Sequence, residues 1–209
     1  MDTRTELLNA AAAVFSQHGF RGSTTRRIAE AAGVNEVTLF RYFGSKEALL
    51  QEAIASSSEG QFAILLPVTP ADPERELAEW VGALIERLHS KRSIIRKCMS
   101  EIEERPEMIS TAVSTPVRAS TDLAAYLRKL RSLGLADPDF DVAAAATMLM
   151  GTVFHDAMGR EMMPQLYPAA SRAPRLYSRL LLTAIGFKAG AKGTDSGPTN
   201  KKHKPTISS

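Results

Sequence analysis

The chain has 209 residues, of which 44% are apolar and 23% charged, and its net charge is +3. These values are ordinary for a globular protein of one compact domain or two small ones. No run approaches the roughly 18 consecutive apolar residues of a membrane span, and the start lacks the layout of a signal peptide. We therefore expect a cytoplasmic protein without a membrane partner. The single cysteine, Cys98, has no partner for a disulfide or a cysteine metal cluster.

The positive charge lies at the end of the chain. Residues 1–50 carry a net charge of +1, residues 51–187 carry −2, and residues 188–209 carry +4. The final segment is polar and rich in Gly, Pro, Ser and Thr, so residues 189–209 are predicted to form a disordered basic tail. The Lys-Lys-His-Lys run is interpreted as part of a solvated tail, and contact with DNA phosphates without sequence preference is the alternative.

The apolar period is helical nearly throughout, which predicts an all-α fold of about nine helices. Asp72 before Pro73 marks one helix start as a capping residue and a first-turn proline, and Asp137 before Pro138 repeats that arrangement. Gly19 is placed to end the first helix. We expect helices near residues 3–18, 25–32, 36–43, 46–59, 73–90, 92–104, 107–134 with a break at Pro116, 138–159 and 173–188.

Residues 24–43 have the spacing of two short helices that cross at a steep angle. Thr24 or Thr25 opens the first helix, Gly33 permits a left-handed turn, and Asn35 caps the second. The inward positions are apolar or small: Ile28, Ala29, Ala32, Val34, Leu39 and Phe43. This is the layout of a helix-turn-helix unit, whose second helix enters the major groove of DNA.

The outward side of that second helix carries side chains that suit base edges. Glu36, Val37 and Thr38 occupy its first turn. A carboxylate accepts from cytosine, a valine meets a thymine methyl, and a threonine can do either. We therefore expect these three residues to face bases.

The flanking positions carry groups that suit phosphate. Lys46 follows Ser45, a good N-cap, and so places a positive charge at the positive end of a helix dipole. A bound phosphate oxygen would reverse the sign of that unfavourable effect. Tyr42, with its hydroxyl tip, and Thr25, with its hydroxyl and nearby free amides, suit the same partner. These three residues are predicted phosphate contacts.

The block from Thr3 to Leu50 resembles the DNA-binding domain of TetR-family transcriptional regulators, most densely in TTRRIAEAAGVNEVTLFRYFGSKEALL. The resemblance implies that Arg26 contacts a base or phosphate. It departs at Phe40, where the family usually has tyrosine, and Arg41 beside it is a candidate to compensate for the lost hydroxyl. The predicted domains are a helix-turn-helix domain at 1–45, a helical effector-binding and dimerisation domain at 46–188, and the tail.

The same resemblance implies partners for the body of the protein. It implies a homodimer whose last two long helices, near 138–159 and 173–188, form a four-helix bundle with those of the second copy. Stripes at Ala144, Met148, Gly151, His155 and Met158, and at Leu176, Leu180, Ala184 and Phe187, are suited to that packing. It also implies that the fourth helix relays the presence of a small ligand.

An effector cavity is the least specific prediction. Met and aromatic side chains make adaptable apolar linings, although ordinary core residues have the same composition. The candidates are Trp80, Leu84, Met99, Ile102, Tyr126, Met150 and Phe154. The acidic run at residues 101–107 is interpreted as a solvated face.

The function predicted is a ligand-responsive repressor that a small molecule releases from a palindromic operator. An architectural helix-turn-helix protein without an effector is the alternative. An enzyme is not expected, because no nucleophile, metal set or phosphate loop is visible, and no cofactor is predicted.

Overall fold

The computed structural model describes residues 2–59, 65–105 and 109–188, and the regular elements in these ranges are all helical. The predicted all-α class is therefore confirmed for the described residues. The elements are α1 (Thr3–Gly22), α2 (Thr25–Ala31), α3 (Glu36–Phe43), α4 (Lys46–Glu59), α5 (Pro73–Ser90), α6 (Arg92–Glu101), α7 (Ile109–Ser132), α8 (Val142–Gly159), a short 3-10 helix (Pro164–Leu166) and α9 (Ala173–Ala184). The predicted tail lies outside the described residues.

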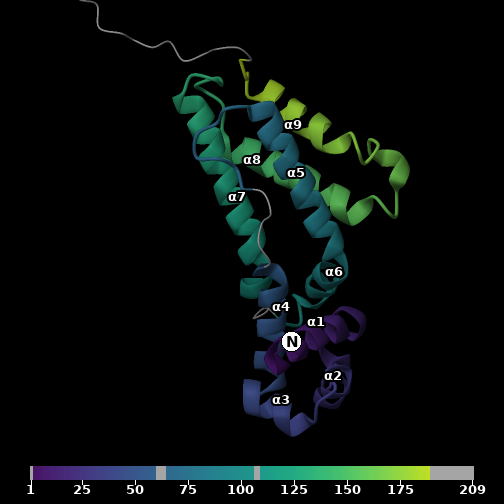
Figure 1. Ribbon diagram of the computed structural model, residues 1–209. Helices are drawn as coiled ribbons and strands as arrows, with labels where there is room; N and C mark the ends of the chain where they lie inside the picture. Colours follow the sequence, from purple (N-terminus) through teal and green to yellow (C-terminus); the bar gives the residue numbers. More distant parts are fainter. Residues whose placement is uncertain (1, 60–64, 106–108, 189–209) are drawn as a thin grey trace, which may run out of the picture.

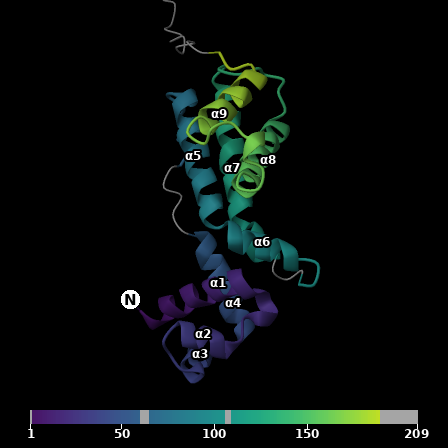
Figure 2. The ribbon, with the colours of Figure 1, turned by 90° about the vertical axis from the view of Figure 1, so that its right-hand side faces the viewer.

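The molecule is elongated, with α1, α2 and α3 at one end and α5, α7, α8 and α9 at the other (Figure 1). We call these two groups the head and the body. Helices α4 and α6 lie between them, which is also visible when the molecule is turned by 90° (Figure 2). Two separate hydrophobic cores match this division, one in each end.

The core of the head extends beyond the predicted domain boundary at residue 45. Leu49, Leu50 and Ala53 of α4 pack into it, and so do Ile94 and Cys98 of α6. The division into domains at residue 45 stays a prediction, but the apolar packing of the head includes side chains from both connecting helices.

The start of α8 differs from the predicted one, and the ends of α1, α6 and α9 also differ from those predicted. Helix α8 begins at Val142 because Asp141, not Asp137, caps it: the Asp141 Oδ1 atom accepts the Ala144 N–H at 2.8 Å. Asp137 instead accepts the N–H of Asp139 at 2.8 Å and so closes a turn around Pro138. The start that the sequence predicts at Asp137 is therefore wrong, and the helix begins after Asp141.

Pro116 does not break α7, which runs from Ile109 to Ser132. A proline in a helix loses one backbone hydrogen bond. The residues that follow it fix the helix by burial, because Ala119, Leu123 and Leu127 are buried in the body core. Helix α1 likewise continues to Gly22, but only after a kink at Gly19, whose φ of 68° is left-handed.

Candidate DNA-binding surface and its connection to the body

The α2–turn–α3 unit is fixed by caps at both helix starts. The Thr24 hydroxyl accepts the Arg27 N–H at 3.2 Å, and the Asn35 side chain accepts the Thr38 N–H at 2.8 Å. Between them Gly33 has a φ of 69°, a left-handed conformation that favours glycine. Leu39 of α3 is fully buried in the head core. The helices therefore form the unit that the spacing predicts.

The outward side of α3 is exposed along its length. Val37 is 75% exposed, and Phe40 and Tyr42 are exposed large side chains on the same short helix. An exposed valine, phenylalanine and tyrosine on one eight-residue helix is unusual for a surface that meets only water. Glu36 and Thr38 are partly buried because each hydrogen-bonds within the unit.

The cations of the head are already engaged within the chain. Arg26 pairs with Glu30 one turn on, at 2.9 Å, and this carboxylate raises the pKa of Arg26. The Arg41 guanidinium lies 5.6 Å from the centre of the Tyr42 ring. Both arginines are exposed, so these contacts are weak and could exchange for phosphate.

Lys46 has a structural role that the sequence did not reveal. Its Nζ atom donates to the backbone oxygen of Phe20 at 3.2 Å and lies 4.1 Å from the centre of the Phe20 ring. Phe20 belongs to the last turn of α1, where a cation is favourable. The lysine at the start of α4 is therefore explained without DNA, and its phosphate contact stays a prediction that rests on the resemblance.

A joint between the head and α6 was missed by the sequence analysis. The Phe20 N–H donates to Glu101 Oε1 at 2.8 Å, and Arg21 pairs with Glu104 at 3.1 Å. The Arg105 guanidinium lies 3.4 Å from the centre of the Phe20 ring. We call Gly19, Phe20, Lys46, Glu101 and Arg105 the α1–α6 joint.

The signals for this joint were present but ambiguous. The sequence predicts a helix end at Gly19, and α1 is indeed kinked there before it continues to Gly22. A Cβ at this position would also overlap Glu101 Oε1. The run at residues 101–107 was interpreted as a solvated acidic face. Glu104 is exposed, whereas Glu101 turns inward and its Oε2 atom is buried without a hydrogen-bond partner.

In the part of the chain that the structure describes, no one of the three cavities given below gathers the seven predicted effector residues. Met99 is 55% exposed on α6, and Ile102 lies in the turn after it. The others belong to the body core or pack against it: Trp80, Leu84, Tyr126, Met150 and Phe154. Their assignment to an effector stays a prediction.

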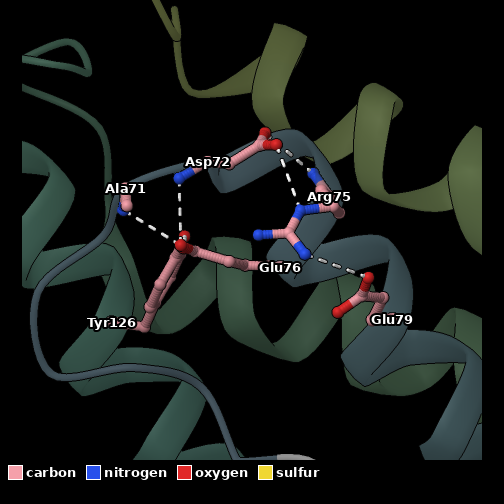
Figure 3. Close-up of polar contacts among 6 residues, drawn as sticks. All are labelled: Ala71, Asp72, Arg75, Glu76, Glu79 and Tyr126. Carbon is pink, nitrogen blue, oxygen red and sulfur yellow. Dashed lines mark hydrogen bonds and ion pairs between the residues drawn. The ribbon is translucent and has the colours of Figure 1, made fainter.

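Tyr126 is the candidate with the best-defined surroundings. Its hydroxyl donates to Glu76 Oε2 at 2.6 Å, and the other oxygen of Glu76 accepts the N–H groups of Ala71 and Asp72 at 2.9 Å (Figure 3). Burial and the Glu76 carboxylate raise the pKa of this tyrosine far above its ordinary value. Tyr126 therefore stays protonated and ties α7 to the start of α5.

An open cavity of about 370 Å³ lies beside Tyr126, between α7 and the segment before α5. Apolar side chains line one side and charged ones the other: Leu65, Leu66, Pro67 and Val68 face Arg118, Asp122 and Lys129, with Ala125 and Tyr126 completing it. Of two further cavities, one of about 560 Å³ lies between α5 and α9, and one of about 420 Å³ lies beside His155 on α8. Tyr126 is the one predicted effector residue that lines any of these three.

Within the part of the chain that the structure describes, no group of three or more His, Cys, Asp or Glu side chains could hold a metal ion. In the same residues, no helix combines the length and the apolar character that a membrane crossing needs.

Comparison with known proteins adds the family to this geometry. Residues 7–53 match the family described as "Bacterial regulatory proteins, tetR family". The chain is 25% identical to the HTH-type transcriptional regulator UidR of Escherichia coli over 153 residues, which cover 73% of this chain and 78% of UidR. It is 45% identical to the HTH-type transcriptional repressor KstR2 of Rhodococcus jostii over 51 residues, which cover 24% of this chain and 25% of KstR2.

The fold of the whole chain has solved counterparts. The transcriptional regulator FadR of Bacillus subtilis, solved in complex with stearoyl-CoA, superposes with a TM-score of 0.63 at 20% identity and covers 87% of this chain and 98% of FadR. This likeness extends through both head and body. The capped helix-turn-helix unit and the matching family segment agree that residues 7–53 form a domain of the tetR family of bacterial regulatory proteins.

Proposed function

We propose that the protein is a homodimeric repressor that binds a palindromic operator through α3 and leaves it when a small molecule binds in the body. The exposed first turn of α3, with Val37 75% uncovered on a rigidly capped helix, is the observation that carries this proposal. A surface of this kind is costly in water and useful in a major groove, where methyl groups and acceptors meet base edges. This proposal includes two partners, operator DNA and a second copy of the chain, and places the protein in the cytoplasm.

The unpartnered face of the body supports the dimer. Met148 on α8 and Leu180 on α9 are 62% and 68% exposed, and Gly151 lies exposed one turn from Met148. Large apolar groups beside an exposed glycine allow another helix to approach closely. These are the positions that the stripes of the sequence predicted for the interface.

Effector control requires that the body and the head move together. Helix α4 packs on α1 and α7, and α6 packs on α1, so the head is connected to the body through both helices. An effector that prefers a conformer with wrongly spaced heads would shift the population away from the DNA-bound state. The complex of FadR with stearoyl-CoA supports a small-molecule effector for this fold, and the partly apolar cavity beside Tyr126 is the place we propose for it.

Fluorescence anisotropy with palindromic duplexes from beside the gene tests this function. The expected result is tight binding with a steep negative dependence on salt, with half-site centres roughly 34 to 36 Å apart, one turn of DNA. Failure of the wild type to bind any promoter-proximal duplex tightly at low salt would contradict the proposal. Tight binding at many scattered sites in a genome-wide map would favour the architectural alternative.

The dimer is tested in the same assay with a matched pair of variants. Leu180→Asp places a charge in the proposed interface and should yield monomers in sedimentation velocity that bind the palindrome much more weakly. Val117→Asp alters an apolar side chain of similar exposure, 58% against 68%, on α7 outside the proposed interface and cavity, and should leave the dimer intact. If both variants lost the dimer and the affinity for the palindrome to the same extent, the proposal that α9 forms part of the interface would be wrong.

A further inference from the structure

Contacts within the protein determine which side chains in the first turn of α3 can donate a hydrogen bond to DNA and which can only accept one. The Thr38 hydroxyl donates to Asn35 Oδ1 at 2.9 Å. That oxygen also accepts the Thr38 backbone N–H at 2.8 Å, which identifies it as the carbonyl oxygen of the side chain. A hydroxyl has one hydrogen, so Thr38 presents to a base edge only its acceptor lone pairs and its methyl group.

Glu36 is fixed in the same sense by the neighbouring helix. Its Oε2 atom accepts the Thr25 hydroxyl at 2.6 Å, which bridges the starts of α2 and α3. An ionised carboxylate can only accept, so the remaining lone pairs of Glu36 offer acceptors to the groove. The Thr25 hydroxyl has also used its hydrogen, which leaves the backbone N–H groups at the start of α2 as the donors for phosphate. Thr25 therefore acts as a positioning residue for Glu36.

Val37 completes the turn with methyl groups alone, and it is the most exposed of the three. Two cationic donors of the head belong to other turns: Arg26 pairs with Glu30, although the Glu36 carboxylate also acts on its charge, and Arg41 lies beside Tyr42. The sequence Glu36-Val37-Thr38 thus presents an acceptor, methyl groups, and an acceptor with a methyl group, with no side-chain donor.

We propose that this turn selects, on the strand that it contacts, bases that offer an amino donor or a thymine methyl to the major groove, and rejects guanine beneath Glu36 and Thr38. Cytosine N4 and adenine N6 are the amino donors of the major groove, whereas guanine offers only its N7 and O6 acceptors there. A carboxylate that faces those acceptors is repelled and left without a partner. This inference rests on the proposed operator binding and adds the base chemistry of the operator.

The test is selection of duplexes from a randomised palindromic library, followed by anisotropy on the selected sites with single base-pair changes. Wild type should select cytosine or adenine at the position that responds to Glu36, with guanine weaker by roughly tenfold, within the 1 to 3 kcal/mol of one base contact. Glu36→Gln is similar in shape and adds an amide donor, so it should tolerate guanine there and reduce this discrimination several-fold.

Thr25→Val separates positioning from direct contact. It keeps the shape of the side chain but removes the hydroxyl that anchors Glu36, so the discrimination at the Glu36 position should fall several-fold. Thr25→Ser restores the hydroxyl and should restore the discrimination, which a purely structural role of the methyl group would not explain. Thr121→Val removes an exposed hydroxyl that donates to a helix carbonyl on α7, and it should select the wild-type site.

The outcomes separate this inference from the function on which it rests. If the wild type selects no duplex, the proposed function fails and the inference fails with it. If the wild type selects a tight palindrome with guanine at the position that changes in Glu36→Gln, the function stands and the inference is wrong. Unchanged selection by Thr25→Val would likewise refute the fixed polarity.

Discussion

The head and the body expose different kinds of surface for different partners. In the head, the outward residues of α3 are held by caps and by a bridge between helices, so each presents a defined chemical group. In the body, the large exposed apolar side chains of α8 and α9, Met148 and Leu180, carry no donor or acceptor of a conventional hydrogen bond that would direct a contact. DNA has a fixed pattern of donors and acceptors and so demands specific side chains, whereas a helix interface demands mainly volume and apolar character.

The same difference appears in two arginine–carboxylate pairs with identical spacing. Arg26 and Glu30 in the head pair at 2.9 Å with side chains 80% and 64% exposed, whereas Arg160 and Asp156 in the body have 21% and 1% exposed. Asp156 also accepts the Tyr177 hydroxyl at 2.7 Å. The exposed Arg26 can exchange Glu30 for a DNA phosphate at little cost, whereas the buried Arg160–Asp156 pair contributes to the stability of the body.

The largest effect expected is from Asp156→Ala. This change removes the carboxylate that partners the Arg160 guanidinium and leaves the Tyr177 hydroxyl without its acceptor, while the contact of Arg160 with the Pro168 carbonyl remains. It should lower the free energy of unfolding by about 3 kcal/mol. Urea denaturation at one fixed protein concentration measures this, since the proposed dimer would add a contribution that depends on concentration. Glu30→Ala, the matched change in the exposed pair, should leave the urea midpoint unchanged. Equal effects in the two variants would contradict the contrast.

A smaller effect is expected at the α1–α6 joint. Gly19→Ala combines a left-handed φ with overlap of the new Cβ and Glu101, and should destabilise the protein by about 2 kcal/mol. Gly134 has nearly the same φ, 70°, but nothing lies within 4 Å of a Cβ placed there. Gly134→Ala should therefore cost only the conformational part, about 1 kcal/mol. If both variants lost the same stability, the close approach of Glu101 to Gly19 would be unimportant.

Local signals explain why the head was predicted more completely than its connections. Thr24, Gly33 and Asn35 act on residues within one turn of themselves, so the helix-turn-helix unit can be identified from spacing alone. Phe20 and Glu101 are 81 residues apart, and no periodicity reports that contact. The choice between Asp137 and Asp141 as the cap of α8 also depends on packing, because the backbone around Asp137 bonds to Ile185 of the segment after α9.

The smallest effect expected is on DNA affinity, from Lys46→Ala. Loss of one phosphate contact should weaken all duplexes about equally, by roughly fivefold, and reduce the salt slope by about one. Lys91→Ala, an exposed lysine between α5 and α6, serves as the control and should change neither quantity. Altered base preference with an unchanged salt slope would remove Lys46 from the phosphate contacts. If Lys46→Ala left the DNA affinity unchanged, the role of Lys46 would be limited to its contact with Phe20.

Cys98 lies where α6 enters the core of the head, and it is 4% exposed. Burial, with Glu101 nearby, raises the pKa of its thiol to about 11, so almost no thiolate exists at neutral pH. The thiol is therefore unreactive while α6 stays packed against the core of the head. Alkylation of Cys98 therefore requires that the thiol become exposed. The rate of alkylation measures how often α6 separates from the core of the head, and no label has to be introduced.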